Sequence, residues 1–220
     1  MFPSARAVTP EILDTLDAGH PEAVRSRRDL RRLDWFLGGS RWIVRSVLDK
    51  GREAGAGVVE IGAGGGRVCE ILAASVPAAP VTGLDLADRP AGLNPRVHWE
   101  RGDLFQTLPD AGGGIVVGSL ILHHFSEAEL RVLGGMLVRF RVLVFSEPLR
   151  TPWSLGLSRL ARPFVGSVTR HDMPASILAG FQTGELASLL GLDNRVWRIS
   201  EVARFTGVLR FKAWRDSSIR

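Results

Sequence analysis

Short apolar runs alternate with helical patterns through the middle of the chain. Five such runs occupy residues 58–61, 81–84, 97–99, 115–117 and 142–145, and each begins with valine or isoleucine. Apolar residues at helical spacing occupy residues 67–74 and 127–137, and Ser126 precedes the second of these stretches as an N-cap. Buried strands that alternate with helices predict a mostly parallel sheet between two layers of helices, the three-layer α/β class.

Amphipathic helices are expected outside this alternating region. Residues 21–37 and 40–48 carry apolar residues at helical spacing among many arginines, and Gly38 and Gly39 separate the two stretches. Residues 151–168 form a further amphipathic stretch after the fifth strand. All three stretches are predicted to lie outside the sheet layer.

The carboxyl-terminal part predicts a hairpin. A helix at residues 183–190 is closed by Gly191, and the segments 195–202 and 205–214 then alternate apolar and polar residues around a tight turn. The expected fold is therefore α/β and Rossmann-like, with a seven-stranded, mostly parallel sheet that ends in an antiparallel hairpin.

Composition narrows the class of protein. The 220 residues include 45% hydrophobic residues, which is enough for one domain with a full-sized core. No long apolar run or secretory start is visible, so we expect a cytoplasmic protein. Cys69 is the single cysteine, so we expect neither a disulfide nor a metal site.

The excess of basic over acidic residues has a simple explanation. The net charge is +5 and the pI is about 10.7, but 26 of the 28 basic residues are arginine and tyrosine is absent, a bias that genomic base composition can produce. We therefore expect no nucleic-acid partner. Contact with an anionic membrane surface stays open, as does the oligomeric state.

The sequence EIGAGGGR at residues 60–67 predicts a ligand-binding turn between the first strand and its helix. A dinucleotide fingerprint would need its third glycine at the position of Arg67 or Cys69, and a P-loop would need Gly-Lys-Ser/Thr, so neither motif fits. The pattern that does occur is an acidic residue, Glu60, followed by glycines at every second position from 62 to 66.

The segment VVEIGAGGGRV resembles the first motif of class I S-adenosylmethionine-dependent methyltransferases. The resemblance covers residues 56–147 and implies that family's fold and its cofactor, S-adenosylmethionine. Glu60 would then hold the cofactor's amino group, Asp85 its ribose hydroxyls, with Asp88 as an alternative, and Asp103 its adenine amino group. The implied cofactor residues are Glu60, Gly62, Ala63, Gly64, Gly66, Asp85, Leu86, Gly102, Asp103, Leu104 and Ser119. The alternative is that Glu60 only caps the following helix.

The fourth strand runs into GSLILHHF, which resembles the post-strand motif of many small-molecule methyltransferases. A histidine there could act as the base for a hydroxyl acceptor. We favour His124 over His123 because adjacent residues at a strand end point to opposite sides. His171, within Arg170-His171-Asp172, is a second candidate, and a purely structural role for the histidines is the alternative.

The acceptor is expected to be a small molecule. The Asn/Asp-Pro-Pro-Tyr/Phe motif of adenine methyltransferases is missing, and Cys69 lies at the wrong place to methylate cytosine carbon. We expect O-methylation of a small aromatic or polyketide-like or lipid-like molecule. The alternatives are a C-methyltransferase of a quinone-like substrate, an RNA or protein methyltransferase, and a cofactor-binding relic of the fold.

The acceptor pocket is expected beneath two lids. Residues 1–52 would form an N-terminal helical lid, and residues 53–220 the methyltransferase domain with a lid insertion at about 150–181. The expected acceptor-binding residues are Trp35, Trp42, His123, Glu147, Trp153 and Arg170.

Overall fold

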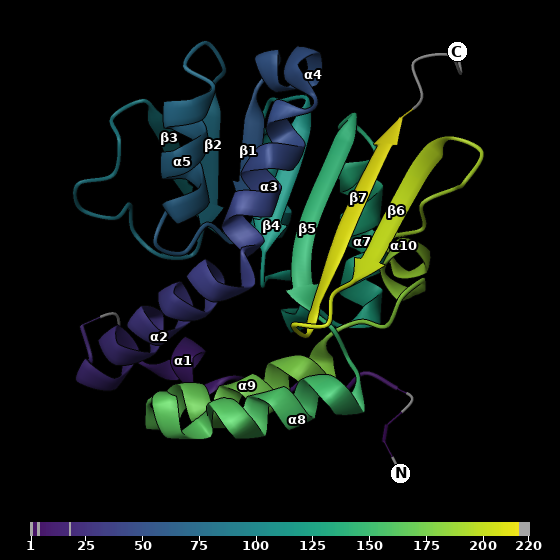
Figure 1. Ribbon diagram of the computed structural model, residues 1–220. Helices are drawn as coiled ribbons and strands as arrows, with labels where there is room; N and C mark the ends of the chain where they lie inside the picture. Colours follow the sequence, from purple (N-terminus) through teal and green to yellow (C-terminus); the bar gives the residue numbers. More distant parts are fainter. Residues whose placement is uncertain (1, 4, 18, 216–220) are drawn as a thin grey trace.

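A computed structural model describes residues 2–3, 5–17 and 19–215. Its centre is a seven-stranded sheet with the strand order β3-β2-β1-β4-β5-β7-β6, flanked by helices on both faces (Figure 1). The first five strands pair in parallel, and β7 pairs antiparallel with both β5 and β6. The predicted mostly parallel sheet with a terminal hairpin is confirmed. The strands are β1 (Val58–Ile61), β2 (Val81–Asp85), β3 (Val97–Arg101), β4 (Ile115–Ser119), β5 (Val142–Pro148), β6 (Trp197–Ala203) and β7 (Val208–Arg215).

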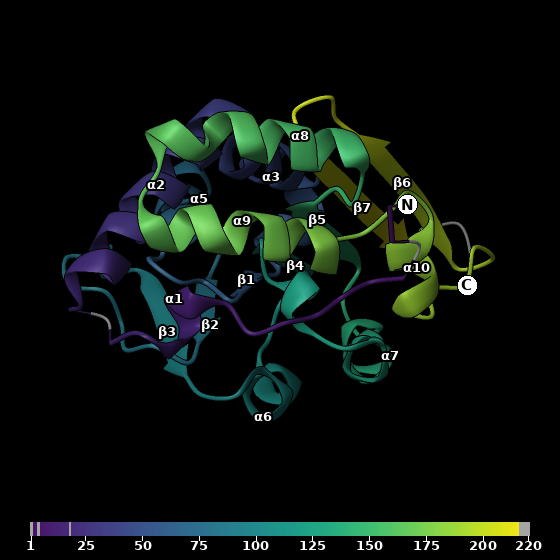
Figure 2. The same ribbon diagram turned by 90° about the horizontal axis from the view of Figure 1, so that it is seen from below.

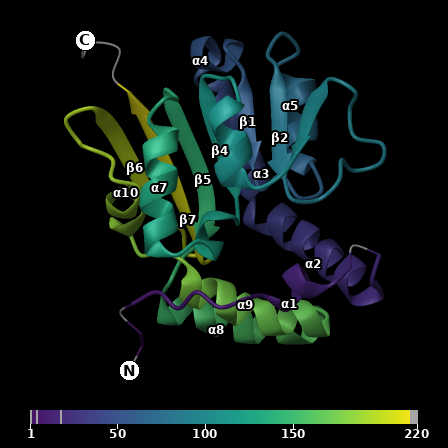
Figure 3. The same ribbon diagram turned by 180° about the vertical axis from the view of Figure 1, so that it is seen from behind.

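Each face of the sheet has its own apolar core. On one face, α3 and α5 bury residues such as Ile43, Val47 and Leu72 against the strands. On the other face, α7 contributes Leu130 and Leu133, and short helices extend the layer (Figure 3). The helices of the two layers are α3 (Gly39–Leu48), α4 (Gly51–Gly55), α5 (Arg67–Ser75), α6 (Leu104–Thr107), the 3-10 helix η1 (Leu108–Asp110), α7 (Glu127–Leu137) and α10 (Glu185–Leu189).

Four further helices lie below the carboxyl ends of the parallel strands. Figure 1 shows these helices at the edge toward which the arrows of β1, β2 and β5 point. They pack mainly on one another, with α9 in contact with the other three. Helices α1 (Ile12–Thr15), α2 (Pro21–Leu37), α8 (Pro152–Ala161) and α9 (Ser167–Ala179) make up this group, with the 3-10 helix η3 (Arg162–Phe164) linking α8 to α9.

The element boundaries differ from the sequence expectation in two places. Residues 167–179 form the 13-residue helix α9, in which Pro174 is tolerated, whereas the sequence predicted no helix between residues 168 and 183. The hairpin turn is centred on residues 204–207, because Arg204 and Val208 close it through a backbone hydrogen bond. None of the helices within the described ranges is long and apolar enough to cross a membrane.

Candidate functional site

The glycine turn links β1 to α5 at the carboxyl edge of the sheet. Gly62 and Gly64 have φ values of 61° and 52°, in the left-handed region that favours glycine. A Cβ atom at Gly62 would lie 2.5 Å from the side chain of Ile121, whereas no atom lies within 4 Å of a Cβ at Gly64. The turn therefore packs tightly against Ile121, just after β4, and has open space in front of Gly64.

Glu60 lies behind this turn and is buried. Its Oε2 accepts a hydrogen bond from the N–H of Cys69 in α5 at 2.9 Å. Burial raises the pKa of the Glu60 carboxyl to about 7. The helix-capping contact that we considered as the alternative role of Glu60 is thus present, and it occupies one carboxylate oxygen.

Asp85 joins the end of β2 to the glycine turn. Its Oδ2 accepts from the N–H of Gly64 at 2.7 Å, and its Oδ1 accepts from the N–H of Ala87 at 2.8 Å. Leu86 is exposed beside it. Asp88, the alternative ribose partner, instead pairs with Arg101 at 2.8 Å. Of the two candidates, Asp85 is the one that reaches the turn.

Residues 102–104 follow β3 next to Asp85. The N–H of Gly102 donates to the Asp85 carbonyl at 2.9 Å, and Ala63 is linked in the same way to Leu84 at 3.1 Å. The Asp103 side chain is exposed and caps α6 by accepting from the N–H of Phe105 at 2.8 Å. Three strand ends therefore bring the predicted cofactor residues, Leu104 included, to one edge of the sheet.

The chain turns sharply at the end of β4. Leu120 has a φ of 56°, a strained value for a residue with a branched side chain, and its N–H donates to the Ser146 carbonyl at 2.9 Å. Ser119 precedes this turn and lies close to Gly39, at the start of α3. The turn leads into the 3-10 helix η2 (Leu122–His124), which carries both candidate histidines.

Glu147 of β5 fixes the position of η2. The side chain is fully buried, and its Oε1 accepts from the N–H groups of Ile121 and Leu122, both at 3.0 Å. Its Oε2 accepts from Nδ1 of His123 at 2.9 Å. Glu147, predicted to bind the acceptor, is therefore enclosed by protein and supports His123 from behind.

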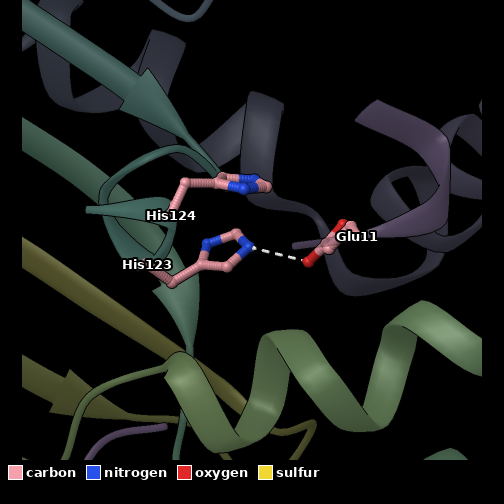
Figure 4. Close-up of side chains that lie close together, drawn as sticks. All are labelled: Glu11, His123 and His124. Atoms are coloured by element: carbon pink, nitrogen blue, oxygen red, sulfur yellow. Dashed lines mark ion pairs between the residues drawn. The ribbon is translucent and has the colours of Figure 1, made fainter. Parts of the chain in front are cut away.

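His123 lies between two carboxylates. Its Nε2 faces Oε1 of Glu11 at 3.4 Å (Figure 4), and its Nδ1 faces Oε2 of Glu147 at 2.9 Å. Burial by itself lowers the pKa of His123, but the hydrogen bonds and charges of Glu11 and Glu147 outweigh this effect and raise it to about 9. His123 is therefore a cation at neutral pH.

His124 is more accessible and lies beside His123. Its side chain is 27% exposed, and its Nδ1 faces Oδ2 of Asp14 at 3.4 Å. The hydrogen bond to His124 lowers the pKa of Asp14. The expectation that the two rings point to opposite sides is wrong, because their centroids are 4.2 Å apart. That expectation assumed an extended strand, whereas the residues form a 3-10 turn.

The N-terminal segment supplies the acidic partners of both histidines. Asp172 of α9 holds this segment by accepting from the N–H groups of Ile12 and Leu13, each at 3.0 Å. Arg6 adds hydrogen bonds to the carbonyls of His123 and Phe125. Sequence reasoning missed Glu11 and Asp14, since isolated acidic residues at or within a short helix match no motif.

The remaining predicted residues lie apart from the histidine pair. His171 is exposed and contacts Asp172 at 3.0 Å, and Arg170 donates to carbonyls of the segment between α8 and α9. Trp35 and Trp153 are 63% and 60% exposed. Trp42 is half buried, with Arg210 over its ring.

Glu11, His123 and His124 also have the composition of a metal-ligand set. One donor atom from each lies within 4.8 Å of the others. Figure 4 shows the three side chains close together. Two histidines and a carboxylate suit divalent transition metals. The protonated His123 already satisfies Glu11 and Glu147, so an ion pair accounts for the contacts of this ring.

Comparison with solved structures identifies the fold. The chain is similar to the plantazolicin methyltransferase BpumL in complex with S-adenosylhomocysteine (SAH), with a TM-score of 0.66, 13% identity and coverage of 86% of this chain and 90% of BpumL. Magnesium protoporphyrin IX methyltransferase from Synechocystis PCC 6803 is similar with a TM-score of 0.55 and 18% identity, and the match covers 82% of this chain and 84% of that protein. The pyocyanin biosynthetic protein PhzM is similar with a TM-score of 0.53 and 22% identity, and the match covers 74% of this chain and 51% of PhzM.

These likenesses show that the chain has the fold of these methyltransferases. Neither a protein-family model nor a curated protein sequence matches the chain. The predicted fold class is confirmed at the level of architecture.

Proposed function

We propose that this chain is an S-adenosylmethionine-dependent methyltransferase that methylates an oxygen of a small aromatic or polyketide-like or lipid-like molecule. The observation that carries the proposal is the meeting of the glycine turn with Asp85. The Gly64 N–H is held by the Asp85 carboxylate at 2.7 Å, with open space in front of the glycine. A ligand that lies along this turn would meet backbone, a carboxylate and an apolar strand end together.

The residues present fit this cofactor. Glu60 would attract the cofactor's ammonium group, since a nearby cation favours the ionised form of a carboxyl whose pKa is raised. Asp85 would exchange its bond with Gly64 for the ribose hydroxyls, and Asp103, with one oxygen engaged by Phe105, would accept from the adenine amino group. The bound cofactor would supply an electrophilic methyl group on a sulfonium.

His124 is the residue that we assign to proton transfer. A phenol has a pKa of about 10, so a base helps its oxygen to react at neutral pH. His123 is protonated between Glu11 and Glu147, whereas His124 is partly exposed beside it. His123 would then orient η2 and place a positive charge next to the acceptor.

The class of acceptor rests on two lines of support. The similar solved structures are named for plantazolicin, magnesium protoporphyrin IX and pyocyanin biosynthesis. In addition, the helices α1, α2, α8 and α9 lie at the edge that carries the histidines (Figure 1). We assign α1 and α2 of the N-terminal region and the insertion at about 150–181 to a lid over the acceptor, whereas α3, also within the expected lid range 1–52, packs on the sheet.

A transfer assay tests this proposal. The chain is incubated with S-adenosylmethionine that carries a labelled methyl group and with alkylated phenols, hydroxylated aromatic polyketides, quinols, RNA or protein. We expect the label on a phenol or enol oxygen. Label on RNA, with turnover that salt suppresses, would support an RNA methyltransferase instead. Cofactor binding without transfer to any acceptor would support a relic of the fold.

A further inference from the structure

Helix α8 packs with its polar side inward. Ser154 and Ser158 are buried, whereas Trp153, Leu160 and Phe164 are 60%, 71% and 82% exposed. The three exposed residues recur at intervals of seven and four, which places them along one face of the helix and its η3 extension. A surface helix of a globular protein usually has the opposite arrangement, so this orientation calls for a partner.

Helix α2 repeats the arrangement. Its buried side includes Ser26 and Asp29, which contact α9: the Thr169 hydroxyl lies 2.9 Å from the Ser26 hydroxyl, and Asp29 accepts from the N–H of Gly166 at 2.7 Å. Its outer side carries exposed apolar residues, Val24 and Trp35, among exposed arginines. Polar contacts thus hold α2 to α9, the serines of α8 bond within their own helix and its N-cap, and both helices leave apolar residues outside.

The two outer sides join into one surface. Phe164 lines a surface groove together with Val24, Arg25 and Arg28 of α2. At the other end of α8, the indole N–H of Trp153 donates to the carbonyl of Phe205, which is itself 75% exposed. Figure 2 shows α8 and α9 side by side across this side of the molecule, with α2 next to them.

We call this surface the arginine–aromatic face. It consists of Val24, Arg25, Arg28, Arg31, Arg32 and Trp35 of α2, Trp153, Arg159, Leu160, Arg162 and Phe164 of α8 and η3, and Phe205.

The arginine–aromatic face is positively charged. The chain has no acidic residue between Glu147 and Asp172. The acidic residues of α2 are engaged within the protein. Glu22 accepts a hydrogen bond from the Ser167 hydroxyl, and Asp34 accepts one from the N–H of Ser40. Asp29 accepts from the N–H of Gly166 and lies 3.8 Å from the Arg32 guanidinium. Among the described residues, Arg32 pairs with Asp29, and no ion pair with a carboxylate is formed by the other arginines of the face.

We propose that the arginine–aromatic face docks on a membrane leaflet that contains anionic phospholipid. Tryptophan, phenylalanine and leucine side chains that project singly among arginines suit the headgroup and acyl boundary of a bilayer. Trp153 and Phe164 are separated by about 16 Å along the helix. A fluid bilayer accepts such spaced side chains without matching pockets, whereas a protein partner usually buries a central cluster.

Docking in this way would place the candidate active site at the membrane surface. Helix α8 begins at Pro152, shortly after β5 ends at Pro148, and β5 carries the Glu147 that supports the histidines. An acceptor dissolved in the bilayer would then reach the carboxyl edge of the sheet without crossing water. This consequence rests on the proposed function, but the docking itself does not.

Vesicle flotation of the full chain tests the proposal. Vesicles of phosphatidylcholine alone are compared with vesicles that also contain phosphatidylglycerol. We expect binding to the anionic vesicles that declines as salt rises. Arg28→Gln/Arg31→Gln should lower the partition coefficient about 25-fold, at about fivefold per arginine. Leu160→Ser/Phe164→Ser should lower it about tenfold or more.

Matched variants separate this surface from general effects. Arg45→Gln/Arg52→Gln changes exposed arginines on α3 and α4, and Val132→Ser/Val202→Ser changes exposed apolar residues on α7 and β6. Both controls should bind vesicles like the original chain. Absence of binding to anionic vesicles, or equal losses in test and control variants, would overturn the proposal.

A second copy of the chain is the competing occupant. Light scattering that shows a dimer dissociated by Leu160→Ser/Phe164→Ser, together with no vesicle binding, would assign the face to self-association and overturn membrane docking. SAH binding, measured in parallel on every variant, reports on the proposed function separately.

Discussion

His123 and His124 are adjacent in the chain and lie in different surroundings. His123 is enclosed by Glu11 and Glu147, which keep it protonated with a pKa of about 9. A histidine that already carries its proton cannot take one from an acceptor. His124 is partly exposed and meets a carboxylate, Asp14, at one ring nitrogen. The two histidines thus suit different roles, orientation for the first and proton transfer for the second.

His124→Ala should therefore impair turnover without impairing cofactor binding. Loss of a general base lowers kcat by about 100-fold or more. The measurement pairs kcat for methyl transfer to the phenolic acceptor with the Kd for SAH, which should stay within about twofold of the original value. His98→Ala, at an exposed position on β3, is the control and should change neither. Full turnover by His124→Ala would remove the proposed base.

Glu60 shows how one carboxyl can have two roles. It caps α5 through the N–H of Cys69, and its burial keeps the pKa near 7, close to the point at which the carboxyl can ionise when a cation arrives. Burial also raises the pKa of the neighbouring Cys69 thiol, which identifies that cysteine as a packed residue.

The raised pKa of Glu60 predicts that cofactor affinity depends on pH. Below its pKa the free protein holds Glu60 protonated, and binding of an ammonium ligand must release that proton. The affinity for SAH should therefore fall as pH drops through 7, by about tenfold in all between about pH 8 and pH 6. Glu60→Gln should bind more weakly at high pH and lose the dependence. An unchanged pH profile in Glu60→Gln, measured by titration calorimetry, would assign the effect to another group.

Residue-level prediction succeeded where spacing carries information. The alternating glycines after Glu60 lie in the expected turn, and the carboxylate of Asp85 reaches it because parallel strands end at the same edge. Glu11 and Asp14 could not be found in this way. Their contacts with the histidines join residues more than 100 positions apart, which only the folded chain brings together.

At the scale of elements, the pattern of buried residues decided which strands and helices could be predicted from the sequence. The five parallel strands were predicted from short apolar runs, and the two hairpin strands from alternating apolar and polar residues. All seven strands were therefore predicted, with shifts of a few residues at their ends. Helix α9 was missed because Pro174 and a charged Arg-His-Asp run interrupt its pattern of apolar residues. Proline lacks an N–H, but a helix that is held by neighbours on several sides can accommodate the lost hydrogen bond.

The glycine pair of α7 gives a matched test of packing between elements. A Cβ at Gly134 would lie 2.1 Å from the backbone carbonyl oxygen of Leu190, whereas no atom lies within 4 Å of a Cβ at Gly135. Gly134→Ala should therefore force α7 away from the end of α10 and destabilise the protein by about 2 kcal/mol. Urea denaturation measures the change in the free energy of unfolding.

Gly135→Ala serves as the control for the same substitution one position later. Alanine favours a helix over glycine by about 0.8 kcal/mol, so this variant should be as stable as the original chain or slightly more so. Equal destabilisation by the two substitutions would mean that α7 does not pack against Leu190 as described.

At the scale of the whole molecule, the sequence showed that amphipathic helices exist but not which way they face. The apolar residues of α2 and α8 were expected to cover an acceptor pocket. Trp35, Trp153 and Phe164 are instead exposed, while Ser26 and Ser158 face inward. Helical periodicity defines a face, and a buried polar contact such as that of Asp29 with Gly166 can reverse which face is covered.

The carboxyl edge of the sheet brings together all parts of the candidate site. The glycine turn, the ends of β2 and β3, the histidines of η2 and helices α1, α2, α8 and α9 all lie at this edge (Figures 1 and 4). The assignment of a methyltransferase to this arrangement depends first on whether the edge binds the cofactor.

Titration calorimetry with SAH tests that central claim most directly. The original chain should bind one equivalent. Gly64→Val should weaken binding, because valine is strained at a φ of 52° and its side chain would fill the open space. Asp85→Ala should weaken it by removing the ribose partner, by about tenfold or more in each case. Gly191→Val, at a φ of 64° with no atom within 4 Å, and Asp193→Ala are the controls and should bind normally. Unimpaired binding by both Gly64→Val and Asp85→Ala, or no binding by the original chain, would contradict the account.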